Sequence, residues 1–162
     1  MNLIDSNYHW LFLAPLGAAV AHMFEEFVWP GGFMSWYRRY RGTSVSSITP
    51  RLLIITNVVL LAVCVDTAFV ADTPIGAAYW IGVSAILASN GLWHVWAAVK
   101  GRVYSPGMVT GLLLYVPLAI YGCIHFLKSG SVSIGSAATA LLIGGSYPLW
   151  SAVYHARSGT AS

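Results

Sequence analysis

The chain has 162 residues, of which 57% are hydrophobic and only 8% are charged. An ordinary soluble domain has roughly 25% charged residues, so the composition excludes that class and indicates a membrane protein. The formal net charge of +3 does not indicate a nucleic-acid partner, because the basic residues lie mostly in short connections between apolar runs. There they report membrane topology instead. We therefore expect a lipid bilayer, and no nucleic acid, as the partner of this chain.

Five apolar runs are long enough for a membrane-spanning helix, which needs about 20 mostly apolar residues. They cover approximately residues 9–29, 52–71, 76–99, 108–127 and 133–155. We expect an all-α bundle of five transmembrane helices that forms a single domain over residues 1–162. A further segment, 33–41, mixes aromatic residues with arginines, which is typical of a short helix at the membrane surface; a solvated basic loop is the alternative.

The first run carries two further signals. Ala19-Val20-Ala21 has the form of a signal-peptide cleavage site, but no Lys or Arg precedes the run, so we expect a retained span. Gly17 and Ala21, four residues apart, predict a close-packing face on this helix. Mild kinks are expected at prolines inside the first, fourth and fifth runs, namely Pro15, Pro117 and Pro148.

The basic residues predict the orientation of the bundle. With the N-terminus outside and the C-terminus inside, only Lys128 lies on the outer side. The cytoplasmic side then receives all the other basic residues, which are Arg38, Arg39, Arg41, Arg51, Lys100, Arg102 and Arg157. This asymmetry follows the positive-inside rule and predicts a multi-pass protein of the cell (inner) membrane.

The first run contains an unusual polar cluster, His22-Met23-Phe24-Glu25-Glu26. Ionisable residues inside a membrane are costly and seldom lack a partner, so this cluster is a candidate functional site. His22 lies three residues before Glu25 and four before Glu26, which places the imidazole and at least one carboxylate on one helix face.

Helical rise predicts the depth of each polar side chain. At about 1.5 Å per residue, His22 lies roughly 10 Å inside the cytoplasmic edge, and Asn57 and His94 lie at nearly the same depth. Asn90 is one turn deeper than His94 on the same helix face, and His155 lies close to the inner edge. Separate runs therefore place ligand-capable side chains in the cytoplasmic half of the bundle.

Imidazole and carboxylate ligands suit a divalent transition metal, namely Zn, Fe(II) or Mn(II). A His and a carboxylate one helical turn apart also occur in the metal sites of helix bundles. We expect His22, Glu25, Glu26, His94 and His155 to be the ligand candidates. A proton relay or a substrate-cation site is one alternative. The other is an ion-pair network that only fixes helix packing.

Three short motifs occur in order along the chain. They are HxxEE at His22–Glu26, NxxxH at Asn90–His94 and YxPG at Tyr104–Gly107. This combination resembles the HXXEE-domain family of small multi-span membrane proteins. The resemblance implies that the residues of the three motifs are signature positions, and it implies little about activity, because the function of that family is uncharacterised.

The remaining polar residues have more auxiliary roles. Asn90, together with Asn57, is expected to bind substrate or cofactor or to orient an imidazole, since neutral amides are poor ligands for transition metals. Tyr104 is either an interfacial aromatic residue on a tight turn or a proton donor at the mouth of the site. Asp66 and His125 fall in the outer half of the bundle and could pair there.

These observations favour a metal-dependent membrane enzyme that acts on a lipid or another hydrophobic substrate. Glu25 and Tyr104 are the candidate catalytic residues, because a metal-bound water or substrate oxygen needs a nearby acid or base. Trp93 and Trp96 could line an apolar substrate cavity. One alternative is a metal-ion or proton transporter or channel, with Asp66 and His125 as the outer candidates. The other is a membrane protein that binds a hydrophobic ligand without catalysis.

Overall fold

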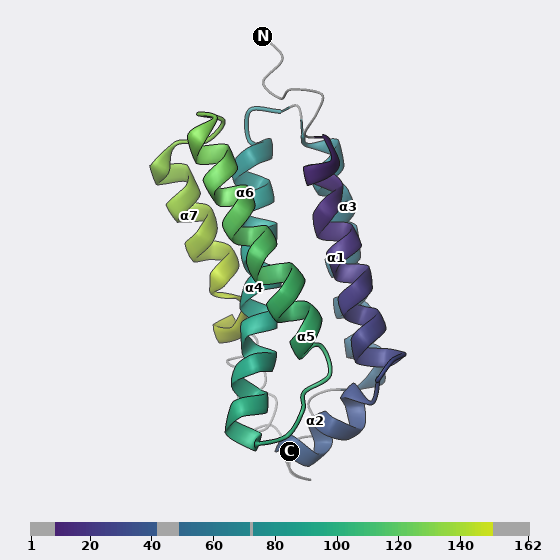
Figure 1. The fold of residues 1–162 in the computed structure, drawn as a ribbon. Helices are drawn as coiled ribbons and strands as arrows, with labels where there is room; N and C mark the ends of the chain where they lie inside the picture. The colour runs from purple at the N-terminus through teal and green to yellow at the C-terminus, as the bar shows by residue number, and fades with distance from the viewer. Residues whose placement is uncertain (1–8, 42–48, 72, 151–162) are drawn as a thin grey trace.

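The computed structural model describes residues 9–41, 49–71 and 73–150 (Figure 1). Every regular element in these ranges is helical and none is a strand, which confirms the prediction of an all-α chain. In chain order the elements are α1 (His9–Phe27), α2 (Phe33–Arg41), α3 (Pro50–Phe69), α4 (Gly76–Gly101), α5 (Met108–Thr110), the π-helical turn η2 (Gly111–Tyr115), α6 (Val116–Lys128) and α7 (Ile134–Gly145).

Two of the predicted apolar runs differ from regular helices. In the fourth run, η2 lets the Val116 N–H donate to the carbonyl of Gly111 five residues back. Pro117 comes next and explains this turn, because proline has no N–H and its ring collides with the carbonyl four residues earlier. In the fifth run, α7 ends at Gly145 before a turn at Ser146, and residues 151–155 lie outside the described residues.

Two helical stretches are long and apolar enough to cross a membrane, Pro50–Phe69 and Met108–Lys128. Five apolar helices were predicted to do so. The 12 residues of α7 are fewer than the roughly 20 that a spanning helix needs. In α1, the polar HxxEE motif interrupts the apolar sequence.

Helix α4 is the centre of the bundle and contacts α1, α3, α6, α7 and η2. Figure 1 shows these long helices running along the molecule, with α2 across its lower end. Trp80 of α4 is fully buried and donates its indole N–H to the carbonyl of Leu11, 2.8 Å away. The Trp80 ring also packs against Phe126 of α6. One side chain thus joins three helices near the start of α4.

Further along α4, its backbone approaches the backbone of η2 at two glycines. A Cβ atom on Gly91 would lie 2.7 Å from the Cα of Gly111, which leaves no room for a larger residue. Gly17 has no atom within 4 Å of its Cβ position. The predicted close-packing face on α1 is therefore wrong at Gly17, and the close approach occurs between α4 and η2.

The chain reverses direction between α1 and α2 through Gly31 and Gly32. Their φ angles of +70° and +84° lie in the left-handed region that glycine tolerates best. Helix α2 then packs Phe33 and Trp36 in a cluster with Ala97 of α4. As a result, aromatic rings cover the C-terminal part of α4.

Replacing Gly91 by alanine tests the importance of the glycine contact. We expect Gly91→Ala to lower the free energy of unfolding by about 1–3 kcal/mol, because the new methyl group forces α4 and η2 apart. Gly17→Ala is the matched control and should raise stability by up to about 1 kcal/mol, since it improves helix propensity without a clash. Thermal unfolding of the purified proteins measures both. A Gly91→Ala protein as stable as wild type would contradict the prediction.

Candidate metal centre

Three ionisable side chains converge in the interior between α1 and α4. His22 and Glu26 come from α1 and His94 comes from α4, and their exposed fractions are 1%, 5% and 1%. One ligand atom from each lies within 4.8 Å of the others. This buried group, which we call the His–Glu–His cluster, could hold a metal ion.

The distances within the cluster match those between ligands of one small cation. Oε1 of Glu26 lies 3.6 Å from Nε2 of His22 and 3.1 Å from Nε2 of His94. Metal–nitrogen bonds of about 2.0–2.1 Å place two tetrahedral ligands roughly 3.4 Å apart. The two distances from Glu26 are therefore already close to those between ligands of a divalent ion, and the cluster's ligand atoms all lie within 4.8 Å of one another.

The second nitrogen of each imidazole contacts a hydroxyl group. Nδ1 of His22 lies 3.0 Å from Oγ1 of Thr110, and Nδ1 of His94 lies 3.0 Å from Oγ of the buried Ser105. The Thr110 hydroxyl donates its own hydrogen to Glu25. It must therefore accept the Nδ1–H of His22, while Nε2 of the same ring faces the cluster. Such contacts to the second ring nitrogen commonly orient metal-binding histidines.

Glu25 lies beside the cluster but has other partners. Its carboxylate accepts the backbone N–H groups of Val109 and Thr110 at 3.0 and 2.7 Å. It also accepts the hydroxyls of Tyr104 and Thr110. Four donors from one segment thus satisfy a charge that was predicted to bind metal. The structure gives Glu25 a role in holding Thr110, and through it His22.

The turn before α5 brings these donors to Glu25. Gly107 has a φ angle of +94°, and a Cβ atom there would lie 2.7 Å from Cε1 of His22. Both its backbone conformation and its contact with the imidazole therefore require glycine. This explains the glycine of the YxPG motif, because only that residue lets the segment pass directly over His22.

The other predicted residues lie in different surroundings. Asn90 places its amide nitrogen 3.2 Å from Nε2 of His22, next to the cluster. The amide of Asn57 donates to the carbonyl of Leu53 on its own helix, 2.9 Å away. His155 lies outside the described residues.

The two predicted outer residues have neighbours of their own. Asp66 is an exposed residue that forms a hydrogen bond with Tyr79. The ring of His125 stacks on that of Tyr121, with a centroid distance of 6.1 Å. Whether Asp66 and His125 act as a second polar site stays a prediction.

Aromatic rings complete the walls of the cluster. The ring of Tyr115 lies 4.6 Å from that of His22, measured between centroids. Trp93, Phe33 and Trp36 lie 4.9, 5.8 and 6.3 Å from the ring of His94. These contacts keep water away from the imidazoles, and in such surroundings electrostatic interactions are stronger than in water.

Sequence reasoning missed several residues of the site, namely Ser105, Val109, Thr110 and Tyr115. Ser105 had a signal, because it lies inside the YxPG motif. Thr110 and Tyr115 had none: they follow the motif in an apolar helix, and only the π-helical turn and the glycine contact bring them to His22. The backbone N–H of Val109 cannot be read from a side-chain pattern.

Together, these contacts define an all-α helical protein with a buried His–Glu–His cluster of the kind that binds metal ions. A family model described as a protein of unknown function with HXXEE motif matches residues 10–122. The chain therefore belongs to the HXXEE family, and the resemblance noted from the three motifs is confirmed. Neither the curated proteins nor the solved structures include a match to this chain.

The contact between Tyr104 and Glu25 can be tested by measuring protein stability at alkaline pH. Burial and the hydrogen bond to Glu25 raise the pKa of the Tyr104 phenol above its ordinary value of about 10. The folded chain therefore retains this proton at a pH where the unfolded chain loses it. The stabilisation is fully present below pH 10 and is lost as the pH rises further.

We expect the melting temperature of Tyr104→Phe to fall less steeply than that of wild type between about pH 9 and 11. Below that range the variant should be less stable by about 1 kcal/mol, the usual loss for one hydrogen bond. Thermal unfolding across this pH range measures both effects. Parallel curves for the two proteins would show that Tyr104 does not hold its proton in this way.

Proposed function

We propose that this protein is a metal-dependent membrane enzyme that acts on a lipid or another hydrophobic substrate. The observation that carries the proposal is the convergence of two imidazole nitrogens and one carboxylate oxygen within 4.8 Å, in a buried site. Two histidines and one carboxylate also leave coordination positions open for substrate.

The donor set narrows the choice of metal. Two imidazoles and a carboxylate are typical of catalytic zinc sites and of non-haem Fe(II) sites, and they also suit Mn(II). Cys64 packs in a separate hydrophobic cluster with Leu87 and Tyr115, so it does not add a thiolate to this set. When bound, the ion would polarise a substrate oxygen or activate water. Hydrolysis, isomerisation, cyclisation and Fe-dependent oxidation are all within the reach of such a site.

The residues around the cluster would orient a ligand, contact the cation or substrate, and supply a proton. Glu25, through Thr110, fixes the orientation of His22. Asn90 lies 3.2 Å from Nε2 of His22, where rotation of its amide would present an oxygen to a cation or to substrate. The phenol of Tyr104 stays protonated at neutral pH and would supply a proton at the edge of the site. Tyr104 is partly exposed, which suits a group that meets an incoming substrate.

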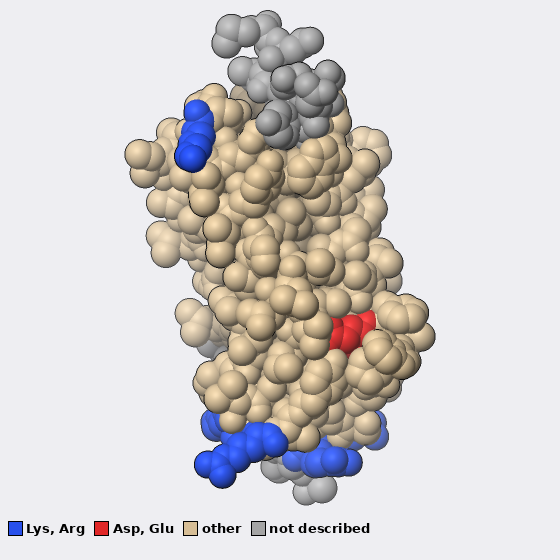
Figure 2. Space-filling model, viewed as in Figure 1, with Lys and Arg blue, Asp and Glu red and all other residues tan. Residues whose placement is uncertain are grey.

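We also propose that the chain forms one domain that crosses the bilayer five times, with the N-terminus outside. Only 11% of the most apolar window of α3 is buried inside the molecule, so its apolar side chains need an apolar environment outside it. Figure 2 shows basic residues mostly at the lower end, and above them a face that is uncharged except for one acidic patch and one basic residue near the top. The lower end carries α2 and the last turn of α4, with Arg38, Arg39, Lys100 and Arg102.

The positive-inside rule would place this basic end in the cytoplasm. The His–Glu–His cluster would then lie in the cytoplasmic half of the bilayer, within reach of a substrate that enters from the inner leaflet. The inner membrane of the cell is the proposed location. A reporter fused to the N-terminus should be detected on the outer side of the membrane, and one fused to the C-terminus should be detected on the cytoplasmic side.

Elemental analysis of protein purified without added metal tests the proposal. We expect close to one equivalent of Zn, Fe or Mn in wild type, and loss of most of it in His22→Ala and in His94→Ala, because each change removes one of three ligands. His9→Ala is the matched control: it removes an exposed imidazole at the start of α1 and should retain the metal. Sub-stoichiometric metal in wild type, unchanged in both site variants, would sink the proposal.

Two substitutions at Thr110 sharpen this experiment without touching a ligand. Thr110→Val keeps the shape of the side chain but removes the hydroxyl between Glu25 and His22, and we expect metal affinity to fall about 10–100-fold. Thr110→Ser keeps the hydroxyl and should bind nearly as tightly as wild type. Competition with a metal chelator measures the affinities. If Thr110→Val bound metal as tightly as wild type, Glu25 and Thr110 would not orient His22 for metal binding.

Transport of a metal ion or of protons is the main alternative. A transporter needs polar access from both faces, whereas the cluster lies towards the basic end, and Asp66 and His125 are the outer candidates. Ion uptake into liposomes separates the two functions. The enzyme should produce no gradient-driven uptake, while a transporter should produce uptake that His94→Ala abolishes.

A further inference from the structure

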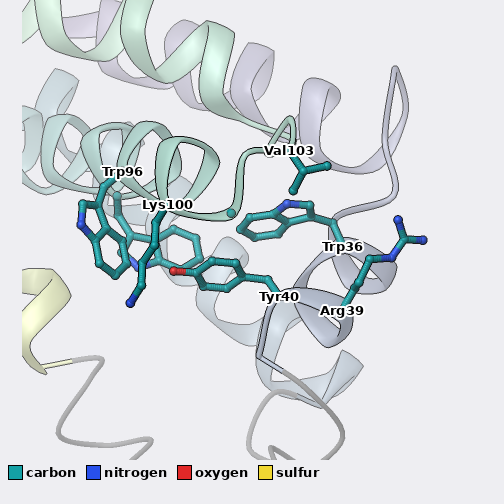
Figure 3. Close-up of a pocket in the computed structure, with 8 residues that line it drawn as sticks. Trp36, Arg39, Tyr40, Trp96, Lys100 and Val103 are labelled. Carbon is teal, nitrogen blue, oxygen red and sulfur yellow. The ribbon is translucent and has the colours of Figure 1, made fainter.

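A cleft of about 600 Å³ opens at the basic end, where α2 packs on the C-terminal part of α4. It lies outside the His–Glu–His cluster, although one of its lining residues, Trp93, is inside the NxxxH motif. Figure 3 shows its lining, which combines aromatic rings with two cationic side chains: Trp36, Arg39, Tyr40, Trp96, Lys100 and Val103.

The two cations of the cleft have no acidic partner among the residues that the structure describes. Within the described ranges, the ion-pair contacts of carboxylates are those of Glu26 with His22 and His94, and neither Arg39 nor Lys100 takes part. Nζ of Lys100 instead lies 4.7 Å from the ring of Trp96, a cation–π contact. Both side chains are exposed at the rim, so their charge is available to an anion.

The wall of the cleft also contains an unsatisfied donor. Trp36 is 8% exposed, and its Nε1–H has no hydrogen-bond partner among the described residues. Buried N–H groups normally have one. In Figure 3 the indole nitrogen of Trp36 lies on the ring edge nearer Val103, which also lines the cleft. This nitrogen has almost no accessible surface, so a ligand in the cleft reaches it only after the Trp36 ring shifts.

The cleft and the His–Glu–His cluster share a wall. Trp93 lines the cleft, and its ring lies 4.9 Å from that of His94; Trp36 also contacts both. One layer of aromatic rings therefore separates the two. A molecule with its anionic end in the cleft would extend its apolar part along rings that border the cluster.

We propose that this cleft binds the phosphate headgroup of an anionic phospholipid, and that such a lipid is the substrate class of the neighbouring centre. The second half of this statement rests on the proposed function. Arg39 and Lys100, which lie on opposite sides of the cleft in Figure 3, attract the anionic headgroup, and the rings of Tyr40 and Trp96 contact the glycerol and the first acyl carbons. A free phosphate ion would leave those rings exposed to water. Trp96 is already 52% exposed, as expected for an aromatic residue at a lipid–water boundary.

Quenching of tryptophan fluorescence by brominated phospholipids tests the binding. The purified full-length chain is studied in mixed micelles with brominated phosphatidylglycerol or brominated phosphatidylcholine, because Trp36, Trp93 and Trp96 lie around the cleft. We expect the anionic lipid to reach half-maximal quenching at about a tenfold lower mole fraction. The Arg39→Gln/Lys100→Gln variant should lose this preference, whereas Arg39→Lys/Lys100→Arg should retain it.

A charge-matched control separates the cleft from the general attraction of a basic surface. Arg38→Gln/Arg102→Gln removes two exposed charges from the same end of the molecule, outside the lining of the cleft. It should keep the tenfold preference. An equal loss of preference in both double variants, or no preference in wild type, would overturn the proposal. Displacement of the brominated lipid by millimolar inorganic phosphate would overturn the assignment to a lipid headgroup.

The metal content of the same samples distinguishes the two proposals. Arg39→Gln/Lys100→Gln should contain as much metal as wild type, because neither residue belongs to the cluster. If wild type contains metal but shows no preference for the anionic lipid, the lipid site in the cleft is contradicted and the proposed function stands. If wild type prefers the anionic lipid but contains no metal, the proposed function is contradicted and the cleft remains a lipid-binding site.

Discussion

The structure depends on the need to satisfy two adjacent carboxylates in its interior. Glu25 and Glu26 are both only 5% exposed, and an uncompensated buried charge is strongly destabilising. The two solutions differ. Glu25 accepts hydrogen bonds from four donors of the segment before and within α5, while Glu26 lies against two imidazoles. One carboxylate is therefore fixed by the chain itself, and the other faces groups that can also bind a cation.

The backbone between α4 and α6 is shaped to meet this need. Gly107 lets the turn pass over His22, the first N–H groups of α5 point at Glu25, and Gly111 lets η2 lie directly on Gly91 of α4. The π-helical turn then ends at Tyr115, whose ring packs on His22. Because π-helical turns are often found at functional sites, a π-helical turn at this position agrees with the role proposed for the cluster.

Much of the fold and part of the site could be predicted from the sequence. Apolar runs predict helix positions well, because a helix that is buried or inserted in a membrane needs apolar side chains. Helical spacing correctly placed His22 and Glu26 near His94. Depth could not tell which of two adjacent carboxylates faces the cluster, since Glu25 and Glu26 differ by about 100° around the helix. That choice is made by Thr110 and Val109, far along the chain, through contacts that only the tertiary structure brings together. Depth also grouped Asn57 with these residues, and the structure shows its amide donating to Leu53 on its own helix.

Helix α2 connects the cluster to the surface of the molecule. The ring of Trp36, a residue of α2, contacts His94 on one side and lines the cleft on the other. Removing that ring would therefore alter both sites at once. Arg39 and Lys100 contact only the outer side. A change in charge at these two positions therefore acts on the anion and leaves the imidazoles in place, whereas a change in the aromatic layer cannot separate the two effects. The layer also keeps the cluster dry, which strengthens the attraction between Glu26 and its imidazoles.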